Sequence, residues 1–102
     1  MRRGTTPTHT FNLPEDFTTL EELKIVYAQS GKEILTKYKQ DCAPRGTSVS
    51  VTLTQEETLK FSACSPCQIQ LRALTATGQA LASEIMEIKV LPILDNGVLV
   101  CN

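Results

Sequence analysis

The fold of this chain is decided by Glu22-Leu-Lys-Ile-Val-Tyr-Ala-Gln29, by the Ser30-Gly31 pair that follows it, and by Lys32-Glu-Ile-Leu-Thr-Lys-Tyr38. Apolar and polar residues alternate on both sides of the pair, as they do in strands that bury one face. Glycine adopts the positive φ of a tight turn at no steric cost. The stretch therefore predicts a β-hairpin that turns at Ser30-Gly31.

The beginning of this hairpin has a second interpretation. Thr19-Leu-Glu-Glu22 fits a helix-capping pattern. Leu20, Leu23 and Tyr27 also stand at helical spacing. Ile25-Val-Tyr27, in contrast, is rich in the β-branched and aromatic residues that favour strands. We predict a strand here, with a helix over 19–29 as the alternative.

Two further stretches show the same alternation. Residues 68–77 reach Gly78-Gln79 and resume over 80–90, which predicts a second hairpin. Residues 48–54 alternate valine and leucine with hydroxyl side chains and form the clearest single strand of the sequence. Thr54-Gln-Glu-Glu57 is a capping box, so 55–60 is predicted as one helical turn.

The remaining segments are short. Residues 1–10 are polar and predict an extended lead-in, and 11–13 predict a first strand before Pro14. Residues 14–19 predict a loop or a single helical turn. Pro44 and Gly46 predict a turn over 41–46.

Six or seven short strands separated by turns are typical of a sandwich. We predict one domain over 1–102, an all-β antiparallel β-sandwich, immunoglobulin-like, with one short helical turn near residues 55–60. Residues 91–102 are a C-terminal tail or a final strand. The predicted core consists of Phe11, Leu23, Ile25, Tyr27, Leu35, Val49, Val51, Leu53, Leu59, Phe61, Ile69, Leu71, Ile85 and Ile88.

Composition narrows the class of protein. The 102 residues are 41% hydrophobic and 21% charged, which is typical of a globular chain. A net charge of −1 and an isoelectric point near 5.8 provide no basic face, so no nucleic acid is expected as a partner. No apolar run is long enough to cross a membrane, and the first ten residues do not resemble a signal peptide. We expect a cytosolic protein.

The sharpest local motif is Cys64-Ser-Pro-Cys67. This spacing serves redox dithiols and halves of zinc sites. Further zinc ligands would have to come from Cys42, Cys101 and His9, which stand at irregular distances along the chain. The strand predicted directly after the motif favours a plain turn flanked by two small buried residues. We predict no metal or cofactor, and a small thiol- or metal-binding accessory protein that uses Cys64 and Cys67 is the alternative function.

Other residues give no indication of an enzyme. His9 is the only histidine, and the sequence implies no partner for it on an exposed strand edge. Helix capping accounts for adjacent acidic residues such as Glu56 and Glu57. Glycines stand singly at turns, so no phosphate-binding loop is present. We predict no catalytic residue and no small-molecule substrate.

The C-terminal region carries apolar side chains beyond the last predicted strand, which ends at residue 90. They are Leu91, Ile93, Leu94, Val98, Leu99 and Val100. A domain of this size has limited capacity to bury them, so they are candidates for contact with another protein. Alternatively, residues 98–100 pair as a final core strand.

Several segments resemble a group of small proteins encoded in phages and prophages of Gram-positive gut bacteria. The similar segments are Met1-Arg-Arg-Gly-Thr-Thr-Pro-Thr-His-Thr-Phe-Asn-Leu-Pro14, Val26-Tyr-Ala-Gln-Ser-Gly-Lys32, Leu53-Thr-Gln-Glu-Glu-Thr-Leu-Lys-Phe61 and Ile69-Gln-Leu-Arg-Ala-Leu-Thr75. The resemblance implies a virion-associated or assembly-related protein of the tail or baseplate region. Its implied partners are other phage structural proteins or copies of itself, and its implied location is the host cytoplasm or the virion. It implies no catalytic residue.

Overall fold

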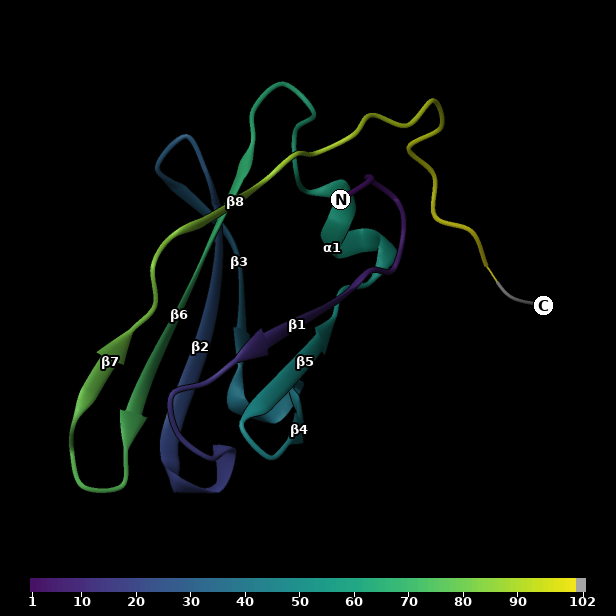
Figure 1. Ribbon diagram of the computed structural model, residues 1–102. Helices are drawn as coiled ribbons and strands as arrows, with labels where there is room; N and C mark the ends of the chain where they lie inside the picture. The colour runs from purple at the N-terminus through teal and green to yellow at the C-terminus, as the bar shows by residue number, and fades with distance from the viewer. Residues whose placement is uncertain (101–102) are drawn as a thin grey trace.

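The computed structural model describes residues 1–100, which form two antiparallel sheets (Figure 1). One sheet contains β2 (Leu20–Gln29), β3 (Lys32–Tyr38), β6 (Cys67–Thr75), β7 (Ala80–Ala82) and β8 (Met86–Ile88). The other contains β1 (Thr8–Asn12), β4 (Ala43–Arg45) and β5 (Ser48–Thr52). The helical segments are α1 (Gln55–Leu59) and two single turns, η1 (Phe17–Thr19) and η2 (Lys39–Asp41). The prediction of an all-β antiparallel fold with one short helical turn is confirmed.

The first hairpin is the one that the sequence predicts. Ser30 and Gly31 both have positive φ, 51° and 76°, which is the backbone of a two-residue turn that matches the twist of paired strands. Tyr27 pairs with Leu35 while Ala28 pairs with Glu33, so Ile34 is an extra residue that forms a β-bulge. The helical alternative for 19–29 is wrong, because β2 occupies nearly all of this range.

One apolar core lies between the two sheets. Eleven of the fourteen predicted core residues are buried in it, among them Tyr27 of β2, Val51 of β5 and Ile69 of β6. Cys67 is buried as well, as the interpretation of its motif as a turn predicts, and so are Leu20 and Val90, which the sequence did not place in the core. The shared core fits a sandwich, and the immunoglobulin-like topology stays a prediction.

Leu59, Ile85 and Ile88 are the three predicted core residues that lie outside it. Leu59 and Ile88 are half-buried, and Ile85 is 61% exposed. The cause for Ile85 is an interruption between β7 and β8. Arg72 pairs with Ala82 and Ile69 with Met86, so β6 advances three residues while its partner advances four. One extra residue reverses which side chains face the core.

The predicted turn over 41–46 contains more structure than expected. It includes the end of η2 and the whole of β4, which pairs with β5 through Ala43 opposite Ser50. Pro44 is tolerated because β4 is one of the two edge strands of its sheet. The predicted lead-in likewise gives way to β1 from Thr8 onward.

The helical turn α1 follows the predicted capping box. Thr54 Oγ1 accepts from the Glu57 backbone N–H at 3.2 Å, and Glu57 Oε1 accepts from the Thr54 N–H at 2.8 Å. Glu57 Oε2 also lies 2.7 Å from Lys37 Nζ of β3, with the two side chains only 18% and 13% exposed. This ion pair and the buried Phe61 attach α1 to the rest of the domain.

The first residues of the chain lie beside the segment that follows β8. Arg2 and Leu91 form a parallel bridge. The Met1 amino group donates to the Lys89 carbonyl at 2.7 Å, and Leu91 N–H donates to the Met1 carbonyl at 2.8 Å. This pairing brings the C-terminal segment to the side of the molecule that carries α1 (Figure 1). Among the described residues, no helix has the length and apolarity needed to cross a bilayer.

Candidate interaction surface

The C-terminal segment is attached to the domain mainly through polar groups. The Gln55 side-chain amide binds the backbone of Leu99 twice, with Nε2 3.0 Å from the Leu99 carbonyl and Oε1 2.8 Å from its N–H. Arg3 Nη1 donates to Asn96 Oδ1 at 2.7 Å. The same guanidinium donates to the carbonyls of Phe61 at 2.7 Å and Leu59 at 3.1 Å, so Arg3 links the segment to the end of α1.

Two of the six predicted contact residues anchor the segment. Leu91 and Ile93 are half-buried. Ile93 packs so closely on Gly4 that a Cβ at Gly4 would lie 2.9 Å from Ile93 Cδ1. Gly4 also has a φ of +75°, which residues with a side chain rarely adopt. Glycine therefore permits both this backbone conformation and the close contact with Ile93.

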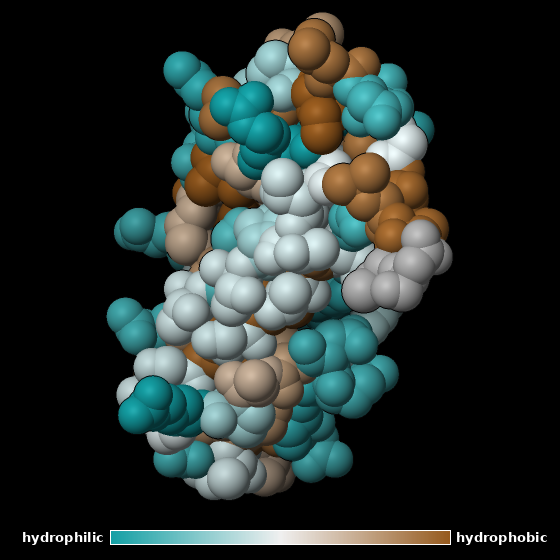
Figure 2. All heavy atoms as spheres, turned by 90° about the vertical axis from the view of Figure 1, so that its right-hand side faces the viewer, coloured by the Kyte–Doolittle hydropathy of each residue, from teal (hydrophilic) through white to brown (hydrophobic). Residues whose placement is uncertain are grey.

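The other four residues point into solvent. Leu94 is fully exposed, and Val98, Leu99 and Val100 are 41%, 76% and 78% exposed. Figure 2 shows the side of the molecule on which this segment lies, and apolar residues gather in the upper half of that view. We call Leu94, Val98, Leu99 and Val100 the apolar tail surface. Gln55 holds the backbone of this surface at Leu99, while the side chains of Leu94, Leu99 and Val100 are largely exposed.

The alternative of a final core strand over 98–100 is wrong. No strand forms there, because the side chain of Gln55 occupies the N–H and carbonyl of Leu99 that a neighbouring strand would use. Sequence reasoning missed Arg3, Gln55 and Asn96 as anchors. Their contacts span 44 or more positions, and no local pattern signals them.

The two cysteines of the Cys64-Ser-Pro-Cys67 motif lie in different environments. Cys64 is exposed, which corrects the expectation of two buried residues, and Cys67 is fully buried at the beginning of β6. Burial raises the pKa of the Cys67 thiol to about 11, so it stays protonated and is a poor metal ligand. Residues 1–100 contain no group of three or more His, Cys, Asp or Glu side chains able to hold a metal ion. Cys101 lies outside the described residues.

We expect the two cysteines to respond differently to serine. Cys64→Ser should leave the free energy of unfolding unchanged within about 0.5 kcal/mol, as is usual for exposed sites. Cys67→Ser places a hydroxyl in the core and should cost about 1–3 kcal/mol. Urea unfolding of both variants checks this, and equal costs would contradict the assignment of Cys67 to the core.

His9 is not the exposed residue that the sequence suggested. It lies on the same inner face of β1 as Phe11, two residues away, and its Nδ1 lies 2.7 Å from the hydroxyl of Tyr27. Burial, and to a lesser degree the positive amino terminus, lower the pKa of His9 below 6.5. Burial also raises the pKa of Tyr27, so the phenol remains neutral. The pair connects the two sheets through a hydrogen bond, and the Tyr27 end is closed to solvent.

This contact predicts a pH dependence of stability. The unfolded chain binds a proton at His9 near pH 6.5, whereas the folded chain binds it less readily. The free energy of unfolding should therefore fall as the pH drops below 6.5, before the carboxylates titrate. Urea unfolding across this window measures the slope. His9→Gln should flatten it because the chain has one histidine, and an unchanged slope in that variant would contradict the prediction.

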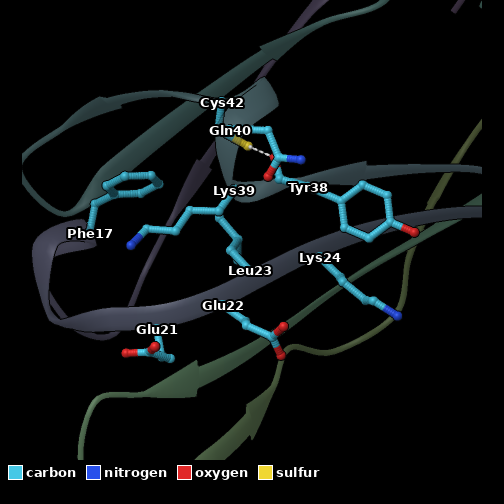
Figure 3. Close-up of a pocket in the computed structure, with 9 residues that line it drawn as sticks. All are labelled: Phe17, Glu21, Glu22, Leu23, Lys24, Tyr38, Lys39, Gln40 and Cys42. Carbon is cyan, nitrogen blue, oxygen red and sulfur yellow. Dashed lines mark hydrogen bonds between the residues drawn. The ribbon is translucent and has the colours of Figure 1, made fainter.

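A pocket of about 470 Å³ lies where β3 ends beside the first half of β2. Lys39 Nζ donates to the Leu20 carbonyl at 2.6 Å. The same Nζ lies 5.3 Å from the centre of the Phe17 ring, and both side chains border the pocket (Figure 3). Lys24 Nζ lies 5.8 Å from the centre of the Tyr38 ring. These contacts hold the lysine side chains against the walls, which favours a structural role for them.

The thiol at the edge of this pocket is also unsuited to act as a nucleophile. Cys42 Sγ lies 3.3 Å from the Tyr38 carbonyl. Burial and the neighbouring Asp41 raise the Cys42 pKa, so the thiolate is disfavoured. The apolar tail surface is therefore the stronger candidate site.

The sequence matches no protein-family model, and a search of curated proteins finds no similar chain.

Proposed function

We propose that this protein is a non-enzymatic interaction module that binds another protein chain through the apolar tail surface. The observation that carries the proposal is the contrast between a held backbone and free apolar side chains. Gln55 and Arg3 fix the segment at Leu99 and Asn96. Leu94, Leu99 and Val100 nevertheless remain largely uncovered.

The folded chain leaves the apolar side chains of this surface exposed to water. Burying one Val or Leu side chain contributes about 1.5–3 kcal/mol. Covering the four side chains of the surface thus offers several kcal/mol to a complex. Because the backbone is already anchored, binding requires little further ordering of the segment, which lowers the entropic cost of association.

Two observations indicate the class of partner, namely the apolar side chains of the surface and the resemblance to phage-encoded proteins. The apolar tail surface consists of aliphatic side chains only, which can pack into an apolar groove on another protein. The resemblance to phage-encoded proteins supports a partner in a phage particle, either a second copy of this chain or another structural protein of the tail or baseplate region.

Light scattering and pull-down tests address this proposal. The full chain should associate with itself or capture a phage structural protein. The double variant Leu99→Ser/Val100→Ser should reduce the apparent affinity at least about tenfold, since 1.4 kcal/mol corresponds to a factor of ten.

Ile85→Ser serves as the matched control. Ile85 is similarly exposed but lies in the loop between β7 and β8. Association should survive this change. A monodisperse monomer that captures no phage protein, or equal loss in both variants, would contradict the proposal.

A further inference from the structure

In the segment Asp95-Asn96-Gly97, the side-chain amide of Asn96 has three groups near it, namely the Asp95 carboxylate, the Gly97 N–H and the Arg3 guanidinium. Gly97 N–H donates to Asp95 Oδ1 at 2.9 Å. Arg3 Nη1 donates to Asn96 Oδ1 at 2.7 Å. Asp95, Asn96 and Gly97 are all exposed, so water reaches them. A carboxylate thus lies on the backbone N–H that follows the asparagine, and a cation lies on the oxygen of the asparagine amide.

We propose that Asn96 is a self-modifying residue that deamidates through the backbone nitrogen of Gly97. The Gly97 nitrogen attacks Asn96 Cγ, and its proton passes to Asp95 Oδ1, which is within the reach of a general base. Negative charge develops on Asn96 Oδ1, where Arg3 stabilises it as an oxyanion donor does.

The remaining steps need only water. The bond between Cγ and the amide nitrogen breaks, and ammonia leaves with the proton that Asp95 had taken. A cyclic imide then joins the Asn96 side chain to the Gly97 nitrogen. Water opens this ring at either carbonyl, which leaves aspartate or isoaspartate at position 96. No electrons are gained or lost.

Glycine at position 97 is part of the arrangement. A Cβ there would lie 3.2 Å from Asp95 Oδ1 and would crowd the base. The chain also provides an internal reference, because Asn12 is exposed too but is followed by Leu13 and lies in β1. Asn96 should react while Asn12 does not.

The products alter the anchor of the C-terminal segment. Aspartate places a carboxylate beside the Arg3 guanidinium, and isoaspartate adds one methylene to the backbone between positions 96 and 97. The longer backbone shifts Leu99 relative to Gln55. This consequence bears on the apolar tail surface, but the reaction itself does not depend on the proposed protein contact.

Peptide mass spectrometry of the full chain, incubated at mildly alkaline pH, tests the proposal. The peptide containing Asn96 should gain the mass difference between an amide and a carboxylic acid, while the Asn12 peptide stays unchanged. Because folding supplies the base and the donor, the folded chain should react at least about tenfold faster at Asn96 than the chain unfolded in urea.

Three variants test the proposed roles of the base, the oxyanion donor and the glycine. Asp95→Ser keeps an oxygen that can accept from the Gly97 N–H but removes the carboxylate base. This variant should slow the reaction at least about tenfold. Arg3→Gln keeps an N–H donor without the charge and should also slow it, with circular dichroism confirming the fold. Gly97→Ala should slow it as well. Equal rates in the folded and unfolded chains, or no change in Asp95→Ser, would overturn the proposal.

Discussion

Replacing Phe61 with alanine is expected to lower the free energy of unfolding by about 3–5 kcal/mol, the usual cost of truncating a buried phenylalanine. Phe61 is almost fully buried, and its ring meets that of Tyr27 edge-on with the centroids 6.0 Å apart. It lies two residues after the end of α1, so its loss leaves a cavity where the helical turn joins the core. Urea unfolding followed by circular dichroism measures the change.

Ile85→Ala is the matched control for this prediction. Sequence reasoning placed Ile85 in the core, whereas the structure leaves it 61% exposed. Its truncation should change the free energy of unfolding by less than about 0.5 kcal/mol. A large cost at Ile85 would contradict the described register between β6 and the segment that follows β7, and a small cost at Phe61 would contradict its place in the core.

Gln29→Leu is expected to cost about 2–4 kcal/mol, because it removes three part-buried hydrogen bonds between a buried side chain and the backbone of the loop. Gln29 is buried at the end of β2, and its Nε2 donates to the carbonyls of Ser62 and Ser65 at 2.7 and 2.8 Å. Its Oε1 accepts from the Ser62 N–H at 2.8 Å. One side chain thus holds the loop between α1 and β6.

Gln70→Leu is the comparison for this change. Gln70 also donates its amide to a backbone carbonyl, that of Ser83 at 2.9 Å, but this hydrogen bond is exposed. Water replaces the lost partner there, so the cost should stay below about 1 kcal/mol. Equal costs in the two variants would show that the loop over 62–65 does not depend on Gln29.

Local patterns were sufficient to predict the parts of the fold that depend on neighbouring residues. Alternation around Ser30-Gly31 predicts the first hairpin, since side chains two positions apart share one face of a strand. The capping box at Thr54 and Glu57 predicts α1 because its two hydrogen bonds join residues three positions apart. His9 was within reach of the same reasoning, because it stands two positions before the buried Phe11.

Other features depend on contacts that no local pattern encodes. The extra residue between β7 and β8 arises where Ser83 binds Leu71, with its Oγ accepting from the Leu71 N–H at 3.0 Å. That contact turns Ile85 outward. In the same way, the held backbone of the apolar tail surface depends on Gln55, which is 44 positions from Leu99. The sequence identified the apolar residues of the surface and left open whether they are core or contact residues.

We propose that the apolar tail surface is exposed in the isolated chain and covered in a complex. Hydroxyl-radical footprinting of the full chain, diluted and in the assembled state, tests it at the side chains themselves. We predict strong labelling of Leu94 and Leu99 in the diluted chain and a clear loss of labelling on assembly, with Ile85 unchanged. Equal labelling of Leu94 and Leu99 in the two states, or protection already present in the diluted chain, would contradict the account.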